Sequence, residues 1–559
     1  AVIRTAIEEV LKDLQIEGVD FVVEHPSELS HGDYTCNVAM AAAQKLSKNP
    51  REVAEEITLK LEGQIEYVEK ISVAGPGFIN IHLSRDFFTT EISRANELGE
   101  DWGKNTLFEG KTVVVEYTDP NPFKEFHVGH LFTNSVGESI ARLFMVSSAD
   151  TKRVNYQGDV GMHVACVLWG MEKLGYAGTY DFTAQELGKA YAHGATAYKD
   201  DETAQVEIRY INKAVYERTD PVTNALYDKG RQISLDYFES VYAVLDTNFD
   251  HYFFESEAGP RGKELVAAHA DIFPESDGAH VFKGEDHGLH TRVFLNSEGL
   301  PTYEAKELAL AKMKEETVGA YDLSIISTSN EITEYFKVLK KAMSFVYPEL
   351  EKKTEHIGHG TVRLSSGKMS SRTGEIIRAL DFIDEIAAAV EQKMTDAGTV
   401  DVDRQLAQSI AVGAIKYATL KGNILQDTVF DKDQALSFEG ASGPYLQYTH
   451  ARICSLLTKA EKVGVKPSIT HAPDIPYEVE RVLYRFPEVI EEAVTAREPH
   501  KVVTYLTELA GLFNTFYAHE KIADPADEFA PYKAAVAEAV GQTLKNGLWV
   551  LGIKAPERM

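Results

Sequence analysis

One stretch of the chain, residues 111–148, constrains what the rest can fold into, because a strand, a polar loop and a helix follow one another there without interruption. The segment TVVVEY at residues 112–117 is β-branched and of strand length, and the following DPNPFKEF carries two prolines that cannot join a sheet. Apolar residues then recur at roughly helical spacing from Leu131 to Phe144. The pattern predicts a buried strand that leads through a loop into a helix.

The quartet HVGH, residues 127–130, lies where that helix is expected to begin. Unpaired backbone N–H groups and the positive end of the dipole at a helix N-terminus favour anions, and His127 and His130 add donors at the same place. Gly129 lets a ligand approach the backbone where a Cβ would clash. We therefore expect a phosphate-binding site; two histidines that merely cap the helix are the alternative.

A second stretch, GKMSSRTG at residues 367–374, is a small, polar, glycine-flanked loop that carries two cations. Loops of this composition can close over a polyphosphate. The whole chain has a net charge of −29, which argues against a nucleic-acid partner, but residues 337–372 hold eight Lys or Arg against three Glu. We expect a mostly acidic body with a narrow basic track beside this loop.

At 559 residues the chain is too long for one core, which suggests three or four domains. No apolar run approaches the roughly 20 residues of a membrane span, and the opening IRTAIEEVLKDL is amphipathic, unlike a signal peptide. The three cysteines, Cys36, Cys166 and Cys454, are far apart and indicate neither disulfides nor a thiolate metal site. These features favour a cytoplasmic enzyme with no membrane partner.

Several segments together resemble one enzyme family. EYTDPNPFKEFHVGH, followed far downstream by GKMSSRTG, is similar to the HIGH and KMSKS motifs of class I aminoacyl-tRNA synthetases. Three further segments resemble arginyl-tRNA synthetases more narrowly: NYQGDVGMH at residues 155–163, PTYEAKEL at 301–308 and SFEGASGPYLQYTHARICSLL at 437–457. The matches run in order from residue 31 to residue 559, so the resemblance covers nearly the full length.

The resemblance implies a multidomain α/β protein with a Rossmann-type catalytic domain of the class I synthetases. We expect a tRNA-contacting α+β domain at residues 1–100, the catalytic domain at 107–388 and an α-helical anticodon-binding domain at 400–559. The order of apolar strands and helical segments supports a parallel sheet covered on both faces. Residues 181–250, which are polar and helical, are expected to form an insertion in this sheet.

The implied activity is that of an arginine–tRNA ligase. Such an enzyme activates L-arginine with ATP, accompanied by Mg²⁺, to arginyl-adenylate. It then transfers arginine to the 3′-terminal adenosine of tRNA(Arg), releasing AMP and pyrophosphate. Because this chemistry needs no protein nucleophile, the site must supply positioning and charge stabilisation. A monomer without a protein-bound structural metal is expected.

By resemblance, two motifs bind ATP. The first consists of His127, Gly129 and His130. The second is a set of five loop residues, Lys368, Met369, Ser370, Ser371 and Arg372. His127, His130 and Lys368 are the expected catalytic groups of the two motifs.

The second lysine of the KMSKS pattern is absent, because Ser371 occupies its position. Some arginyl-tRNA synthetases that lack this lysine carry one just ahead of the HIGH motif, and Lys124 occupies that place here. Lys124 is therefore the expected substitute cation in catalysis. A solvated loop lysine is the alternative.

Arginine recognition requires carboxylates that match a planar fork of donors, because lysine must be rejected by geometry. The resemblance implies that Glu116 binds the guanidinium and that Asn121 binds the amino group. In PTYEAKEL, Tyr303 matches a family tyrosine, and Glu307 stands where the family usually has Asp. For both acids, a surface or core-edge carboxylate is the alternative.

Two segments near these residues depart from the family pattern. Family members often carry a glutamine that binds the substrate amino group in the part matched by STSNEITEYF. This segment contains no glutamine, and Asn330 and Glu331 are the candidates in its place. In NYQGDVGMH, Val160 replaces a family tryptophan, and Asp159 and His163 are weaker candidates. A structural turn explains the second segment equally well.

The helical C-terminal region is expected to read the anticodon. Tyr445 and Tyr448 lie three residues apart on one helical face, where they could stack on unpaired bases; tyrosines of a bundle core are the alternative. The resemblance also places Met559 near the anticodon. The rival interpretations are a class I synthetase for cysteine or glutamine, a noncatalytic tRNA-binding paralogue and a small nucleotidyltransferase.

Overall fold

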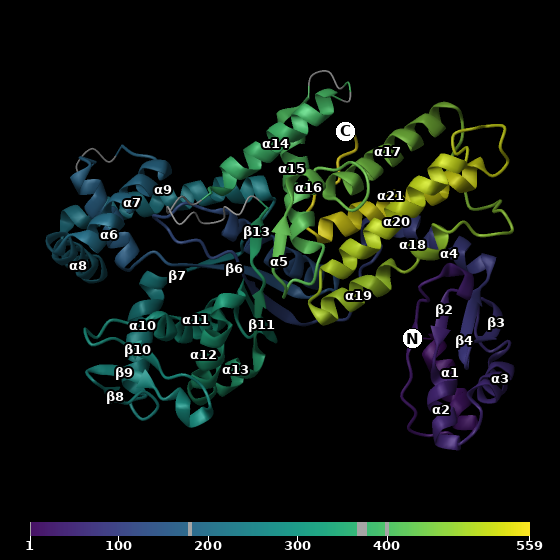
Figure 1. Cartoon of the computed structure of the whole chain (residues 1–559), viewed down its shortest axis with the longest axis horizontal. Helices are drawn as coiled ribbons and strands as arrows, with labels where there is room; N and C mark the ends of the chain where they lie inside the picture. Colours follow the sequence, from purple (N-terminus) through teal and green to yellow (C-terminus); the bar gives the residue numbers. More distant parts are fainter. Residues whose placement is uncertain (1, 177–180, 366–376, 397, 399–401) are drawn as a thin grey trace.

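The computed structural model describes residues 2–176, 181–365, 377–396, 398 and 402–559. A central parallel sheet carries helical layers on both faces, a helical body lies on one side of it, and a small N-terminal domain projects beyond that body (Figure 1). Within the described part of the chain, no helix is long and apolar enough to cross a membrane. The expected combination of a parallel α/β region, an α+β domain and a helical region is confirmed.

The N-terminal domain packs three helices against an antiparallel sheet with the strand order β1-β2-β4-β3. Its helices are α1 (Val2–Asp13), α2 (Val38–Leu46) and α3 (Pro50–Leu61), and its strands are β1 (Val23–Glu24), β2 (Tyr34–Cys36), β3 (Val68–Ala74) and β4 (Phe78–Leu83). The turn between β3 and β4 needs glycine at Gly77, because its φ is +131° and a Cβ would lie 2.9 Å from the Pro50 carbonyl oxygen. α4 (Arg85–Leu98) then leaves the domain.

The central sheet has five parallel strands in the order β12-β11-β5-β6-β7. The strands are β5 (Thr112–Glu116), β6 (Asp150–Gln157), β7 (His251–Phe254), β11 (Leu323–Ser329) and β12 (Thr354–His359). The three valines of β5 are completely buried, as expected for a strand covered on both faces. The chain runs from β5 outward to β6 on one side and later to β11 on the other. The strand order therefore reverses at β5, and ligands of such sheets bind outside the carboxyl ends of the strands at this point.

Helices cover both faces of this sheet. The helix that follows β5 is α5 (Val128–Val146), and the opposite face is covered by α10 (Glu255–Ala268), α11 (Tyr303–Val318) and α12 (Thr333–Val346). Four helices lie between β6 and β7: α6 (Met162–Lys173), α7 (Ala184–Asp200), α8 (Glu202–Glu217) and α9 (Pro221–Leu245). A small sheet of β8 (Glu275–Ser276), β9 (Ala279–Phe282) and β10 (Arg292–Leu295) precedes α11.

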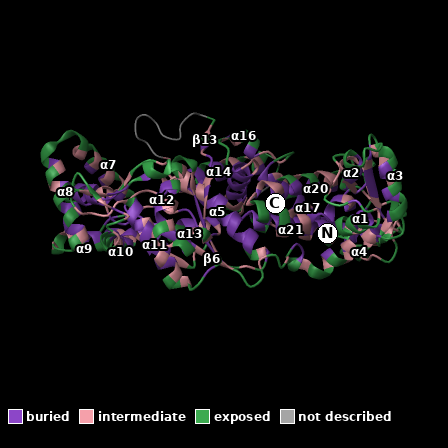
Figure 2. Ribbon diagram, turned by 90° about the horizontal axis from the view of Figure 1, so that it is seen from below, coloured by how far each residue is buried: buried purple, intermediate pink, exposed green. Residues whose placement is uncertain are grey.

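The C-terminal half is helical and shares a core with the sheet. After α13 (Pro348–Lys353) and β13 (Val362–Leu364), it contains α14 (Ala379–Asp396), α15 (Arg404–Leu420), β14 (Thr428–Phe430), α16 (Lys432–Ala435), α17 (Gly443–Lys462), α18 (Glu480–Leu483), α19 (Phe486–Ala496), α20 (His500–His519) and α21 (Ala530–Val550). One buried apolar cluster runs from β5 and α5 into α17, α20 and α21. The purple band in Figure 2 shows this burial through the middle of the molecule.

The N-terminal domain docks on α18 and α19 largely through buried polar contacts. Asp33, 2% exposed, pairs with Arg481 at 2.8 Å and accepts a hydrogen bond from the N–H of Leu83. Arg85 pairs with Glu480 at 2.6 Å. Because the charges lie on different domains, each pair fixes the position of the domain as well as neutralising a buried carboxylate.

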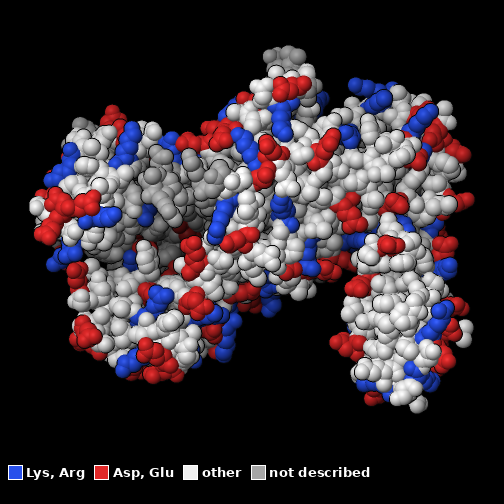
Figure 3. Space-filling model, viewed as in Figure 1, with Lys and Arg blue, Asp and Glu red and all other residues white. Residues whose placement is uncertain are grey.

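The expected basic track is partly neutralised by the chain itself. In the lysine-rich segment, Lys337, Lys340 and Lys352 each pair with a glutamate at 2.6–3.4 Å, and Arg363 lies 3.5 Å from Asp427. On the face drawn in Figure 3, basic and acidic side chains are interspersed. Nonspecific affinity for a polyanion is therefore expected to be modest.

Replacing Arg481 by Met should loosen the docking of the N-terminal domain, because Asp33 would remain buried without its cation. We expect a loss of about 2 kcal/mol, equivalent to a roughly 30-fold faster hydrogen exchange of backbone amides in α18 and β2. Lys48→Met, which removes a partner from the exposed Lys48–Glu56 pair, is the control and should change neither segment. Unchanged exchange in Arg481→Met would show that the pair does not hold the domain.

Candidate active site at the carboxyl edge of the parallel sheet

The HVGH quartet begins α5 at the point where the strand order reverses. His127 is the N-cap residue, and its Nδ1 accepts a hydrogen bond from the N–H of Gly129 at 3.1 Å. The N–H of His127 donates in turn to Nδ1 of His130 at 3.3 Å, and the two rings stack with centroids 3.8 Å apart. The two histidines do cap the helix, and this capping fixes both rings.

The capping bonds also determine where the imidazole protons are. Burial lowers the pKa of both rings, and Lys124 lowers it further, so both are neutral near pH 7. Since Nδ1 of each ring accepts a backbone hydrogen bond, each neutral ring carries its proton on Nε2. The pair therefore presents two N–H donors at the N-terminus of α5.

The segment that follows the second expected ATP motif is attached to this quartet. The N–H of Val128 donates to the Ile377 carbonyl at 3.1 Å, and the N–H of Ala379 donates to the Phe126 carbonyl at 2.8 Å. The expected loop residues lie outside the described part of the chain: Lys368, Met369, Ser370, Ser371 and Arg372. The described chain resumes at residue 377, and Arg378 pairs with His127 in an antiparallel bridge.

Lys124 is half-buried between the quartet and the helical insertion. Its Nζ lies 5.3 Å from the centre of the Tyr191 ring. Burial lowers the pKa of Lys124, and Glu255 opposes that effect at longer range. Among the described residues, none places a carboxylate within ion-pair distance of this ammonium group, so Lys124 is a cation free to meet an anionic ligand.

The two acids expected to bind arginine differ in their environment. Glu116, at the end of β5, is 1% exposed, and its Oε2 lies 2.5 Å from Nζ of Lys314 on α11. Glu307, also on α11, has no cation within ion-pair distance in the described structure. Burial, followed by the charge of Glu116, raises its pKa well above the usual value. Glu307 is thus the carboxylate that lacks a positive partner.

Asn121 lies against the turn that follows β6. A Cβ at Gly158 would lie 2.2 Å from Asn121 Oδ1 and 3.2 Å from Glu255 Oε1, so this contact requires glycine. Glu255 is paired with Lys306 at 2.7 Å, and Nζ of Lys306 lies 5.5 Å from the ring centre of Tyr303. Tyr303 itself is 61% exposed.

Sequence reasoning missed three residues of this site, Glu255, Lys306 and Lys314. All three are less than 5% exposed, yet as single charged residues in helical segments they carry no local signal. The sequence of α11 could have indicated these residues, because the helix lacks a continuous apolar stripe. Glu304, Lys306 and Lys314 are buried among its apolar residues. A helix with buried charges on it faces a polar site or ion pairs.

The GDVG turn is primarily a structural junction. The Asp159 carboxylate accepts hydrogen bonds from Ser256, from the Tyr227 hydroxyl and from Arg231, which joins β6 to α9 and α10. His163 lies 2.9 Å from the Gly158 carbonyl, and burial lowers its pKa to about 3. Of the candidates in STSNEITEYF, Asn330 and Glu331 are exposed in a 3-10 turn after β11.

The expected anticodon residues lie on the helical body. Tyr445 faces inward, where its hydroxyl accepts a hydrogen bond from Asn514 at 3.0 Å. Tyr448 is 37% exposed, and the Arg452 guanidinium lies 4.8 Å from its ring centre and 5.2 Å from that of Tyr517. The core alternative therefore describes Tyr445, whereas Tyr448 belongs to an exposed cluster of rings and guanidinium that the sequence did not indicate.

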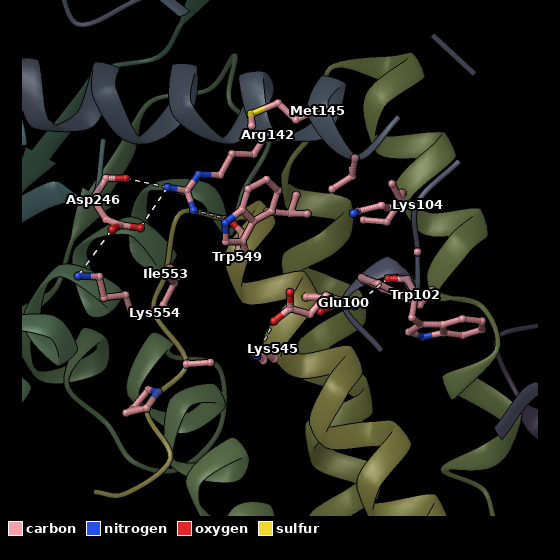
Figure 4. A pocket seen from close by; sticks show the side chains of 18 of the residues that line it. Glu100, Trp102, Lys104, Arg142, Met145, Asp246, Lys545, Trp549, Ile553 and Lys554 are labelled. Atoms are coloured by element: carbon pink, nitrogen blue, oxygen red, sulfur yellow. Dashed lines mark hydrogen bonds and ion pairs between the residues drawn. The ribbon is translucent and has the colours of Figure 1, made fainter. Parts of the chain in front are cut away.

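A separate cavity of about 830 Å³ lies far along α5 from the quartet, between that helix, α21 and the C-terminal tail (Figure 4). Arg142 crosses it and donates to the Trp549 carbonyl at 2.9 Å and to the Asp246 carbonyl at 2.7 Å. Lys554 lies 3.6 Å from Asp246. The charged groups that line this cavity are paired with one another or with neighbouring residues of the chain. We therefore assign the cavity to the junction between domains and not to catalysis.

Among the described residues, no group of three or more His, Cys, Asp or Glu side chains is arranged to hold a metal ion. Tyr117 donates a hydrogen bond to Glu138 below the site. We assign a packing role to this pair and to the three free cysteines.

Three family models match consecutive parts of the chain. Residues 88–432 match the class I tRNA synthetase (R) catalytic domain, residues 446–559 the DALR anticodon binding domain, and residues 1–83 the arginyl tRNA synthetase N-terminal domain. The catalytic match alone spans more than half of the chain. A cysteine or glutamine synthetase and a small nucleotidyltransferase are thereby set aside.

Full-length relatives agree with this. The chain is 28% identical to the arginine–tRNA ligase of Clostridium perfringens, covering 98% of this chain and 97% of the relative, and 29% identical to that of Clostridioides difficile, covering 100% and 99%. The structure is similar to Thermus thermophilus arginyl-tRNA synthetase (TM-score 0.77, 25% identity, 100% and 99% covered) and to the Plasmodium falciparum enzyme (0.80, 22%, 100% and 98%). With the histidine pair at the switch point of its sheet and an anticodon-binding domain attached, the chain belongs to the arginyl-tRNA synthetases, the class I ligases that join arginine to tRNA.

Proposed function

We propose that this chain activates L-arginine and charges tRNA(Arg) at the carboxyl edge of β5, with ATP on the α5 side and arginine on the α11 side. The observation that carries this assignment is the pair of neutral His127 and His130 rings, whose Nε2–H donors lie at the N-terminus of α5. ATP is used as its Mg²⁺ complex, which is a substrate and not a resident cofactor.

In the activation step, the carboxylate of arginine attacks the α-phosphate of ATP, a phosphorus–oxygen bond forms, and pyrophosphate leaves with the electrons of the broken bond. His127 and His130 donate hydrogen bonds to phosphate oxygens as charge builds up on them. Because the rings are neutral and locked by their capping bonds, they act as preorganised donors that need no reorientation. Gly129 leaves the backbone open to the nucleotide.

On the α11 side, Glu307 binds the guanidinium group, since no cation among the described residues lies within ion-pair distance of it. Glu116, whose Oε2 lies 2.5 Å from Nζ of Lys314, completes the arginine site beside Glu307. Asn121 binds the amino group, and Tyr303 closes over the aliphatic part of the substrate. A planar guanidinium can pair bidentately with a carboxylate, whereas the ammonium of lysine cannot.

The five loop residues Lys368, Met369, Ser370, Ser371 and Arg372, which lie outside the described residues, bind ATP by resemblance to the family motif. Lys124 supplies the charge that a second loop lysine would supply in related enzymes. This role is supported by the half-buried ammonium group near the histidines, which has no carboxylate partner in the described part of the chain.

For tRNA, we assign base stacking to Tyr448, with Arg452 and Tyr517 beside it, while Tyr445 holds the helix and Met559 packs near the anticodon. We assign tRNA contact to a domain at residues 1–100 and catalysis to a domain at 107–388 with the insertion 181–250. A third domain, at residues 400–559, reads the anticodon. We further propose a cytoplasmic monomer without a structural metal or a membrane partner.

Pyrophosphate exchange with each of the twenty amino acids tests the substrate. We expect incorporation of label into ATP with L-arginine and with none of the other nineteen amino acids. The family resemblance implies that this exchange requires tRNA. Lysine is the matched comparison, because it carries the same charge in another shape. Exchange with a different amino acid, or with none in the presence of tRNA, would contradict the proposal.

Replacing His130 by Ala should lower the rate of arginyl-adenylate formation on the order of 100-fold or more, the usual cost of losing one preorganised donor. The rate is measured by ATP–pyrophosphate exchange at saturating substrates. His193→Ala, an exposed histidine on α7, is the control and should react at the normal rate. Near-normal exchange by His130→Ala would refute the role of the quartet.

Lys124→Met and Lys368→Met separate the two candidate cations. If Lys124 substitutes for the missing loop lysine, Lys124→Met should lower the activation rate by at least 10-fold, because a cation near the departing pyrophosphate is lost. Lys189→Met, on the exposed side of α7, is the control. Intact activation in Lys124→Met together with its loss in Lys368→Met would show that the loop lysine alone does this work.

A further inference from the structure

Two buried side chains form a clamp between the end of α9 and the end of α21, although these helices match different family models. Lys416, on α15, donates hydrogen bonds to the Leu245 carbonyl at 2.6 Å and to the Gly552 carbonyl at 2.8 Å. Burial lowers the pKa of Lys416 to about 7, and its neutral amine still has one N–H for each carbonyl. Arg142 bridges the same two helix ends on the side of the cavity (Figure 4). Because carbonyls at a helix C-terminus have no partner within the helix, the clamp satisfies groups that the helices leave unpaired.

A hydrogen-bonded path leads from this clamp to the loop that follows β5. The hydroxyl of Thr247, two residues beyond Leu245, donates to Oδ1 of Asn134 on α5 at 3.1 Å. Nδ2 of Asn134 donates in turn to the Thr118 hydroxyl at 3.1 Å. Thr247, Asn134 and Thr118 are at most 3% exposed. Loss of either bond would therefore leave a buried polar group without a partner.

The loop needs external support at the point where this path reaches it. Thr118 has a φ of +80° and Asp119 a φ of +44°, a region that a β-branched residue such as threonine rarely adopts. A backbone conformation of this kind persists only where the surrounding structure determines it. The same loop continues to Asn121 and Lys124 and then to the quartet. The bend at Thr118 thus sets where these two side chains lie.

We propose that Thr247 and Asn134 are positioning residues for the activation step, which fasten the bend at Thr118 to the clamp between α9 and α21. The placement of Asn121 and Lys124 then depends on the docking of α21, although α21 contributes no group to the reaction. A displacement of about 1 Å can lower a rate by about 100-fold, so a distant contact can act on catalysis in this way. This inference rests on the site proposed above.

The two substitutions Thr247→Val and Thr247→Ser test the path, because valine removes the hydroxyl at nearly constant volume and serine keeps it. ATP–pyrophosphate exchange is measured on the full chain with L-arginine and tRNA(Arg). We expect Thr247→Val to lower kcat roughly 10-fold and to leave KM for ATP within about twofold, since the cap of the quartet is retained. Thr247→Ser should be near normal. Thr419→Val, which breaks only a hydrogen bond of α15 to its own Ile415 carbonyl, is the matched control.

Lys416→Met tests whether the path depends on the clamp. We expect roughly 10-fold faster hydrogen exchange of the backbone amides at residues 117–124 in Lys416→Met and in Thr247→Val, and no change in Thr247→Ser or Thr419→Val. Unchanged exchange in β3 and β4 reports that each variant is folded. Since both substitutions break one path, the double variant should lose no more activity than the slower single variant.

A normal rate and normal hydrogen exchange in Thr247→Val would overturn the inference. Equal losses in Thr247→Val and Thr247→Ser, or additive losses in the double variant, would overturn it as well. Failure of the proposed function would look different, because the unaltered chain would then give no pyrophosphate exchange with L-arginine. The hydrogen-exchange comparison would still decide whether Thr247 and the clamp hold the loop.

Discussion

The reciprocal capping of α5 by its own two histidines is the interaction on which the site depends. Each Nδ1 accepts a hydrogen bond from a backbone N–H, so the rings are fixed and the proton of each neutral ring lies on Nε2. Burial keeps both rings neutral, because the charged form would lose hydration without gaining a partner. The helix-capping and phosphate-binding interpretations of HVGH are therefore one arrangement, in which the cap prepares the donors.

That cap is effective because β5 holds the helix in place from below. β5 is the middle strand of five, with parallel neighbours on both sides and its valines fully buried. The reversal of strand order beside it opens the edge of the sheet to ligands. The quartet is also pinned from the side by Ile377 and Ala379, so that residues from distant parts of the sequence meet at one helix end.

A shortage of cations characterises the opposite side of the site. Glu116 and Glu255 are buried and Glu307 is half-buried on this side, and of these three only Glu116 and Glu255 have lysine partners among the described residues. A cationic guanidinium substrate would supply the partner that Glu307 lacks. Further along α5, Arg142 donates a hydrogen bond to the Trp549 carbonyl at the end of α21. The same helix belongs to the apolar core that the catalytic sheet shares with the anticodon-binding domain.

The sequence by itself determined the parts whose signal is local. Neighbouring residues suffice to predict the β-branched strand β5, the prolines after it and the HVGH start of the helix. The family was indicated by motifs that resemble it in the same order along the whole chain. Only the tertiary structure decided which charges pair. Lys314 pairs with Glu116, Lys306 pairs with Glu255, and Trp102, which lies between α4 and β5, is buried and donates a hydrogen bond to Thr543. The reason is physical: helical and strand periodicity report which face is apolar, whereas an ion pair depends on the distance between groups that lie far apart along the chain.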